Sequence, residues 1–349
     1  MTRPTAPTLF LAVLFLSAFT AAQTYTITDL GVFDGNISYA TAINDSGQVV
    51  GASYINKTTS LYHAFIWTAA TGLHDLGTLG GYNSYAFAIN NAGQVVGCAD
   101  VSPSDLVPGH AFLWTESAGM QDLGSLGNGS CAFGINDAGQ VVGYSTIETN
   151  FDQHAFIWSA ATGMQDLGVP ASSETLAAAI NDNGMVVGTY YTAFDGTHAY
   201  LWTQAGGIQD LGNLGVPIAS AGDINNLGQV VGSGEVPPGN ADLYAGFVWN
   251  ASHHMNRLPS PYPGHDATAS AINSTGEIVG FALNAQIAQR ATVWLTPLNV
   301  HDLNQLAVRS PLNLAMAEGL NNLGQIVGVG LLKTDLSVQH AYLATPTGN

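Results

Sequence analysis

Five histidines stand at one place in a recurring His-Ala-Phe-x-Trp motif or a close variant of it, and imidazole is a common zinc ligand. They are His63, His110, His154, His198 and His340. In the ring of sheets derived below, equivalent side chains of neighbouring repeats stand roughly 15–20 Å apart, whereas zinc holds its ligands at about 2 Å. We therefore predict no metal site and no cofactor. Each histidine is expected to have a structural role, hydrogen-bonding locally to an aspartate.

That aspartate opens a recurring Asp-Leu-Gly motif, which raises the question of calcium. A calcium loop brings several oxygen ligands together within a short stretch of sequence. Each Asp-Leu-Gly copy offers one carboxylate, and the chemistry of turns explains its presence. The motif therefore favours a structural role here too.

Polar residues that interrupt the repeat are better candidates for a functional site than residues that build it. Asp223 and Glu318 replace small or apolar residues near the ends of two equivalent strands, and His265, Asp266 and Arg290 occur together in the sixth repeat. Paired carboxyls can carry out glycoside hydrolysis, but the sequence does not give their separation. Drift in decaying repeats is the alternative. Because no nucleophile elbow, metalloprotease motif, P-loop or dinucleotide fingerprint occurs, we assign no catalytic residue.

Three motifs recur together in a fixed order through the chain. Asp-Leu-Gly or a degenerate copy begins at Asp29, Asp75, Asp122, Asp166, Asp210, Arg257 and Asp302, at intervals of 46, 47, 44, 44, 47 and 45 residues. An asparagine followed three places later by glycine occurs at Asn44, Asn90, Asn136, Asn181, Asn225, Asn273 and Asn321. The His-Ala-Phe-x-Trp position holds all six tryptophans of the chain, which are Trp67, Trp114, Trp158, Trp202, Trp249 and Trp294.

Each repeat is predicted to form four strands, named A to D in chain order. Strand A ends at the asparagine, the Asn-x-x-Gly turn leads into strand B, His-Ala-Phe-x-Trp is strand C, and the residues up to Asp-Leu-Gly are strand D. Four short strands in a unit of 40 to 50 residues are typical of a β-propeller blade. The last repeat stops after strand C, and a strand D without its repeat precedes the first one, at Thr26–Gly31. We therefore predict an all-β, seven-bladed β-propeller with four-stranded blades, in which the N-terminal strand completes the last blade; the rival is an open β-solenoid.

The two cysteines, Cys98 and Cys131, leave two interpretations open. Folding back the second A–B hairpin puts Cys98 at the height of Tyr85, and Cys131 is the equivalent of Tyr85 in the next repeat. The two thiols can thus face each other between neighbouring blades and form a disulfide. The alternative is two buried free thiols, which behave as small hydrophobic side chains.

Residues 1–22 have the composition of a signal peptide. Arg3 precedes the apolar stretch Leu9–Phe19, and Thr20-Ala21-Ala22 supplies small residues for cleavage. Residues 23–349 would then form a single propeller domain, and no later stretch is apolar enough to cross a membrane. We expect a secreted protein, either extracellular, at the cell surface or periplasmic, with an uncleaved anchor as the alternative.

The charge balance excludes one class of partner. The chain has 24 acidic and six basic side chains and a net charge of −18. Nucleic-acid binding depends on clustered positive charge, so we expect no nucleic-acid partner. We expect a monomer.

The three motifs together resemble those of the HAF-repeat proteins, probable extracellular proteins named after the His-Ala-Phe triplet. The resemblance spans about Thr24 to Ala344 and departs from the pattern at Arg257, Arg290 and Ala344. It implies an extracellular repeat architecture and no particular chemistry.

The leading functional hypothesis is a non-enzymatic binding or surface-interaction module for an extracellular protein or glycan. The alternative is a glycan-acting hydrolase or lyase with a site near the propeller channel. The connections between strands B and C vary in length and carry the aromatic residues Tyr54, Tyr62 and Tyr191. Because recognition is commonly placed on variable loops of a rigid scaffold, we expect a ligand on the face formed by the B–C and D–A connections.

Overall fold

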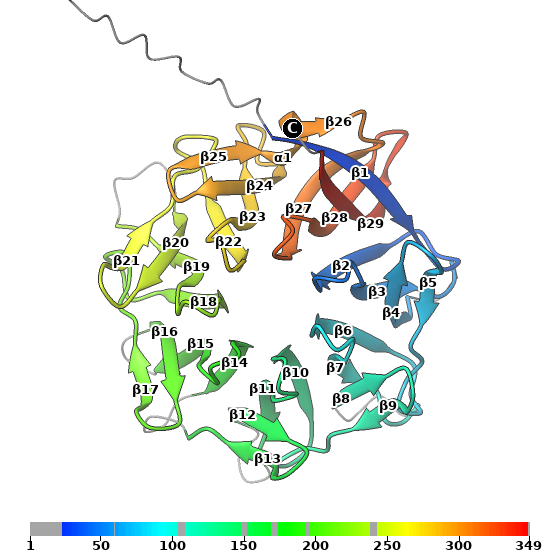
Figure 1. Ribbon diagram of the computed structural model, residues 1–349, viewed down its shortest axis with the longest axis vertical. Helices are drawn as coiled ribbons and strands as arrows, with labels where there is room; N and C mark the ends of the chain where they lie inside the picture. Colours follow the sequence, from blue (N-terminus) through cyan, green and yellow to red (C-terminus); the bar gives the residue numbers. More distant parts are fainter. Residues whose placement is uncertain are drawn as a thin grey trace, which may run out of the picture.

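Seven sheets, antiparallel apart from one short edge strand, surround a central axis, which confirms the prediction of an all-β, seven-bladed propeller (Figure 1). The computed structural model describes residues 23–58, 60–103, 109–147, 152–168, 174–192, 196–237 and 243–347. The proposed signal peptide, residues 1–22, lies outside the described residues. No helix in the described part of the chain is long and apolar enough to cross a membrane.

The first six blades each contain four strands, ordered A, B, C and D from the axis outward. Blade 1 contains β2 (Ser38–Ile43), β3 (Val49–Tyr54), β4 (Tyr62–Thr68) and β5 (Gly72–Asp75). Blade 2 contains β6 (Ser84–Ile89), β7 (Val95–Ala99), β8 (His110–Thr115) and β9 (Gly119–Asp122). Blade 3 contains β10 (Ser130–Ile135), β11 (Val141–Thr146), β12 (Gln153–Ser159) and β13 (Gly163–Asp166). Blade 4 contains β14 (Thr175–Ile180), β15 (Val186–Thr192), β16 (Gly196–Thr203) and β17 (Gly207–Asp210).

Blade 5 contains β18 (Ala219–Ile224), β19 (Val230–Glu235), β20 (Tyr244–Asn250) and β21 (His254–Arg257). Blade 6 contains β22 (Ala267–Ile272), β23 (Ile278–Leu283), β24 (Gln289–Thr296) and β25 (Asn299–Asp302). Blade 7 is assembled from both ends of the chain. Its strands are β27 (Leu312–Leu320), β28 (Ile326–Leu332), β29 (Asp335–Thr347), β1 (Thr24–Gly31) and β26 (Ala307–Val308).

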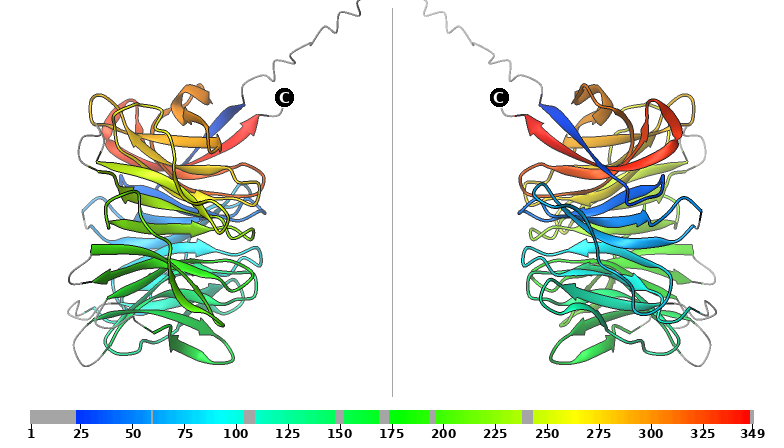
Figure 2. Two further views of the ribbon diagram at one scale, coloured as in Figure 1. Left: turned by 90° about the vertical axis from the view of Figure 1, so that its left-hand side faces the viewer. Right: turned by 90° about the vertical axis from the view of Figure 1, so that its right-hand side faces the viewer.

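The ring closes through β1, as the split repeat predicts. This strand pairs antiparallel with β29, from Thr24 opposite Thr347 to Gly31 opposite Ala341, and the two strands run side by side in Figure 2. Tyr25 of β1 is 1% exposed and packs in the core cluster between blades 6 and 7. The N-terminal strand therefore covers an edge of blade 7 that would otherwise be open, and open edges promote aggregation.

The connection between blades 6 and 7 was not predicted from the repeat. It forms the four-residue helix α1 (Leu303–Leu306), and β26 then pairs in parallel with β1 as a fifth strand of blade 7. The side chain of Asp302 accepts a hydrogen bond from the Asn304 backbone and caps the helix. Leu303 and Leu306 are buried in the same core cluster as Tyr25. These local contacts hold a short helix that has no helical period in the sequence.

The hydrophobic core lies between the blades, in seven clusters. Between blades 1 and 2, Phe112 and Trp114 share a buried cluster with Ala64 and Ile66. Because alternate residues of a strand share one face, the bulky face of one C strand thus meets the slim face of the preceding one.

The His-Ala-Phe and Asp-Leu-Gly motifs are joined within each blade. In four complete blades and in blade 7, the histidine Nδ1 lies 2.6–2.9 Å from the carboxylate of the strand D aspartate. His63, for example, bonds to Asp75, whose carboxylate also accepts the backbone N–H of Gly77. Burial opposes ionisation of Asp75, but these two hydrogen bonds, together with the electrostatic effects of His63 and His74, outweigh burial and lower the pKa of Asp75. The motif histidines therefore occupy structural positions, and no group of metal-ligating side chains occurs among the described residues.

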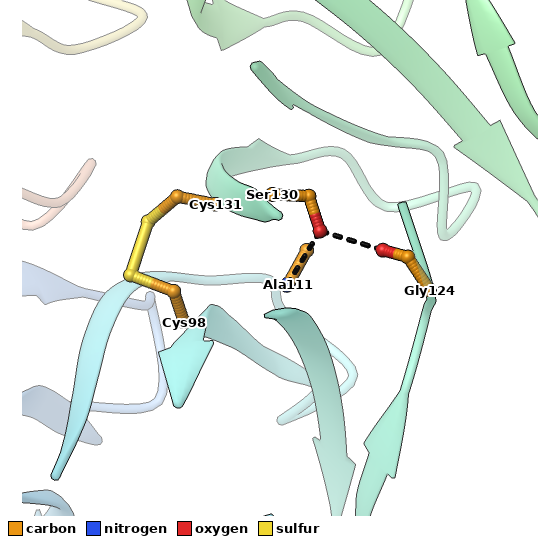
Figure 3. The surroundings of a disulfide bond; sticks show 5 residues. All are labelled: Cys98, Ala111, Gly124, Ser130 and Cys131. Carbon is orange, nitrogen blue, oxygen red and sulfur yellow. Dashed lines mark hydrogen bonds between the residues drawn. A yellow bond between two sulfur atoms is a disulfide. The ribbon is translucent and has the colours of Figure 1, made fainter. Parts of the chain in front are cut away.

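A serine at the start of strand A joins neighbouring blades. The Ser130 hydroxyl donates to the Gly124 carbonyl at 2.6 Å and accepts from the Ala111 backbone at 2.9 Å (Figure 3). Ser38 and Ser84 make the same pair of contacts at their own blade boundaries.

A disulfide between Cys98 and Cys131 crosses the same boundary as Ser130 (Figure 3). The two Cα atoms are 4.8 Å apart, within the range that a disulfide spans. Cys98 lies opposite Tyr85 in the β6–β7 ladder, as the hairpin geometry predicts. The bond ties strand B of blade 2 to strand A of blade 3.

Candidate functional site

Seven buried asparagines of the A–B turns form a closed circle of hydrogen bonds around one mouth of the central channel. Each side-chain amide donates to the backbone carbonyl of the equivalent asparagine in the next blade, at 3.0–3.3 Å. The last bond, from Asn321 to Asn44, joins the two ends of the repeat array. The turn glycine, such as Gly47 with a φ of 76°, adopts the left-handed conformation that this tight turn requires. The asparagine motif is thus part of the ring closure.

The residues after these asparagines line a shallow hollow of about 200 Å³ at this mouth. Three of them are acidic, Asp45, Asp137 and Asp182. Each carboxylate accepts a backbone N–H from the preceding blade and an amide from a neighbouring asparagine. Since Asp45 in particular accepts both donors from Asn322, these oxygens already hold the scaffold together.

A second hollow, of about 260 Å³, lies deeper in the channel. We call it the chamber. It is separated from the asparagine mouth by a ring of branched aliphatic residues whose side chains line both hollows, among them Ile43, Ile89, Ile135, Ile180 and Leu320. Because strand A runs from the B–C/D–A face toward the asparagine turn, the chamber lies on the B–C/D–A side of this ring.

The walls of the chamber are chemically unequal. Blades 2 and 3 contribute Phe87 and Phe133, whose rings meet edge to face with centroids 5.2 Å apart. Blades 5, 6 and 7, across the axis in Figure 1, contribute Asp223, Ser270 and Glu318. The chamber therefore has an aromatic side and an acidic side, and no lysine or arginine is among its lining residues.

Asp223 is held by the backbone of two blades. One carboxylate oxygen accepts the Ile224 N–H and the other accepts the Ile272 N–H of blade 6, both at 2.8 Å. Burial raises the pKa of Asp223 to about 6, although both hydrogen bonds act to lower it. The carboxyl therefore loses its proton close to neutral pH.

Glu318 has no such support. It makes no hydrogen bond or ion pair within the described chain, and burial raises its pKa. Its charge also adds to the effect of burial in raising the pKa of Tyr342, whose hydroxyl donates to the Met316 carbonyl. The residue is half-buried and its carboxylate oxygens remain accessible, so partial loss of water makes the carboxyl costlier to ionise.

The other predicted site residues lie outside the chamber. The rings of Tyr54 and Tyr62 pack at a tilt with centroids 4.2 Å apart, and Tyr62 also contacts Tyr39 and Tyr85, so these four form a tyrosine cluster between blades 1 and 2. Tyr191 lies on blade 4 and is 42% exposed. The predicted aromatic residues therefore do not come together as one group.

The polar residues of the sixth repeat have separate local contacts. Asp266 accepts the backbone N–H groups of Leu243 and Tyr244, and the neighbouring His265 is half-buried. Arg290 replaces the motif histidine and lies 3.3 Å from the buried Asp302, measured from Nε to Oδ2. It thus preserves the pairing between strands C and D.

Sequence reasoning singled out Asp223 and Glu318 but missed the aromatic wall. Phe87, Phe133 and Glu318 occupy the same position, two residues before the aliphatic residue that ends strand A. The full series is Thr41, Phe87, Phe133, Ala178, Gly222, Ser270 and Glu318. This position varies in chemistry while its neighbours repeat, and an alignment of the repeats would have revealed it.

Solved structures share the fold at low sequence identity. The β-propeller domain of the Trilobed protease from Pyrococcus furiosus has a TM-score of 0.58 at 9% identity, over 93% of this chain and 98% of that one. Virginiamycin B lyase from Staphylococcus aureus has a TM-score of 0.57 at 10% identity, over 92% and 99%. A puromycin hydrolase has a TM-score of 0.54 at 11% identity, over 87% of this chain and 52% of that one. These similarities establish the architecture alone.

Comparison with curated protein sequences found no match. The family model described as "Protein of unknown function (DUF3466)" matches residues 120–340, more than half of the chain. This protein belongs to that family.

Proposed function

We propose that this protein is an exported binding protein whose ligand occupies the chamber and enters from the B–C/D–A face. The observation that carries the proposal is the meeting of Asp223 and Glu318, the two strand A residues that break the repeat, opposite Phe87 and Phe133 in one hollow. The chamber shares with small-molecule sites a few polar groups that converge on one hollow beside aromatic side chains.

Export is supported by two features. The first strand begins at Thr24, just past the proposed cleavage after Ala22, so cleavage would leave every strand of the propeller intact. The Cys98–Cys131 disulfide suits an oxidising compartment.

The repeat motifs also favour membership of the HAF-repeat proteins, which are probable extracellular proteins. Mass spectrometry of the secreted protein should find Gln23 at the N-terminus; an intact Met1 on a membrane-bound protein would refute export.

The binding proposal is tested by a ligand screen on matched variants. The mature protein is screened by thermal shift against small molecules and soluble glycans, beside a chamber variant in which Phe87 and Phe133 are both changed to leucine. The control variant changes Leu227 and Leu323 to serine; these side chains are 72% and 64% exposed on the asparagine-turn face. Ligands should shift the melting temperature of the control and the parent but not of the chamber variant. If only the control variant loses binding while it remains folded, the site lies on the asparagine-turn face and the proposed chamber site is wrong.

A glycan-acting hydrolase or lyase is the second candidate, favoured by the two carboxyls in one hollow. A carboxyl with a pKa of about 6, such as Asp223, suits proton transfer near neutral pH. Turnover of a polysaccharide that is abolished in both Asp223→Asn and Glu318→Gln would establish this activity and replace the binding proposal. Turnover that persists in both would exclude the chamber as a catalytic site.

A further inference from the structure

The charge inside the chamber restricts what can bind there. Asp223 and Glu318 line the hollow, and no basic side chain is among the described residues that line it. Asp223 already has its oxygens engaged by the Ile224 and Ile272 backbones, whereas Glu318 is unpartnered within the described chain. Glu318 is half-buried and its carboxylate oxygens are accessible from the chamber, so they can accept hydrogen bonds from a bound cation.

The opposite wall complements a cation as well. An aromatic face attracts a cation within about 6 Å of the ring centroid, because the π-electron density is negative there. Phe87 and Phe133 meet at an interplanar angle of 70°, so they form two sides of a corner. The net charge of −18 further favours the approach of a cation over that of an anion.

We propose that the chamber binds a small organic cation, an amine whose ammonium group is held by Glu318 and whose apolar body rests against Phe87 and Phe133. This inference depends on the proposed binding function and adds the chemical class of the ligand. Ser270, between the two carboxyls in blade order, offers a hydroxyl that can accept a second N–H from a primary ammonium. The ring of aliphatic residues, including Ile135 and Leu320, forms an apolar floor for the body of the ligand.

The test uses three probes that share one shape and differ in charge. Phenethylammonium, 2-phenylethanol and phenylacetate are titrated into the disulfide-intact protein, residues 23–349, by isothermal calorimetry at neutral pH. We expect one site for the ammonium ion, binding at least about tenfold weaker for the alcohol, and none for the carboxylate.

Two variants and a control locate the interaction. Glu318→Gln keeps the size of the side chain and should weaken binding of the ammonium ion by about 10- to 100-fold, as expected for a lost hydrogen bond to a charged group. Phe133→Leu keeps an apolar wall and should weaken it by about fivefold. Asp45→Asn removes a carboxylate from the opposite mouth, where asparagine stands in other blades, and should leave the affinity unchanged.

Equal affinity for the ammonium ion and the alcohol, unchanged binding to Glu318→Gln, or no ammonium binding would overturn the proposed ligand class. If a neutral saccharide binds instead, and Phe133→Leu weakens it, the chamber remains a binding site and only the cation is wrong. If neither the three probes nor the screened compounds bind in the chamber, the proposed function fails as well.

Discussion

Replacing Asp223 by alanine should make the protein more tolerant of a rise in pH. Alanine already stands at the equivalent position in blades 1, 2, 4 and 6, as Ala42, Ala88, Ala179 and Ala271, so the strand accommodates it. The pKa of Asp223 is about 6 in the folded protein, against its ordinary value of 3.8, which represents the unfolded chain. Between about pH 4 and pH 6 the folded state thus binds the proton more tightly than the unfolded state does.

The sign and size follow from this difference. Where the folded state binds more protons, the free energy of unfolding falls as pH rises. Asp223 therefore destabilises the fold least below about pH 4 and most above about pH 6. The difference between the two pKa values corresponds to about 3 kcal/mol. Because part of the side chain faces the channel, where water reduces the penalty, this value is an upper bound.

The assay is urea unfolding of the parent and Asp223→Ala, followed by tryptophan fluorescence, at several pH values from about 4 to 7. The relevant quantity is the free energy of unfolding of the parent minus that of the variant, since other carboxyls titrate alike in both proteins. This difference should fall by up to about 3 kcal/mol as pH rises across the interval. A difference that is independent of pH, or that grows with pH, would refute the reasoning.

Three further predictions concern the contacts that join neighbouring blades and close the ring. Changing Cys98 and Cys131 both to alanine should lower the free energy of unfolding by about 3–4 kcal/mol, because the bond closes a loop with a sequence separation of 33; two titratable thiols in the denatured, unreduced parent would show instead that no bond exists. Ser130→Ala should cost about 1–3 kcal/mol in urea unfolding, since it leaves the Ala111 N–H and the Gly124 carbonyl without their partner; the expectation fails if stability is unchanged. Deleting Thr24–Gly31 should expose β29, lower the melting temperature and cause aggregation visible by light scattering, and a deletion variant that melts like the parent would contradict closure through β1.

The architecture could be predicted from the sequence because each structural feature of a blade is marked by a characteristic residue that recurs from repeat to repeat. The turn glycine, the Asp-Leu-Gly motif and the split of the last repeat are local signals, and together they define strand order and closure. Arg290 shows that a departure from the repeat pattern does not always mark a functional residue. Its departure from the histidine pattern makes it a candidate site residue, yet its guanidinium pairs with Asp302 as the imidazole pairs with the equivalent aspartate in other blades.

The chamber could be predicted only in part because it depends on a β-bulge. With strict alternation, the strand positions of Asp223 and Glu318 would point to opposite sides of the sheet. The register of strand A shifts in every blade, as between Ala221 and Asp223, and this irregularity brings both positions to the channel. A bulge of this kind leaves no distinctive residue in the sequence.

Pairing of the first strand with the last also means that the fold does not depend on where the backbone begins. Thr24 lies opposite Thr347 in the ladder of β1 and β29, so a short linker can join the two ends without moving a blade. The polypeptide could then be opened in the C–D turn or the B–C connection of another blade, such as the connection between Tyr54 and Tyr62, which leaves the circle of asparagines intact. Circular permutants built in this way would allow a reporter or an anchor to be attached at any chosen blade, on either face of the ring.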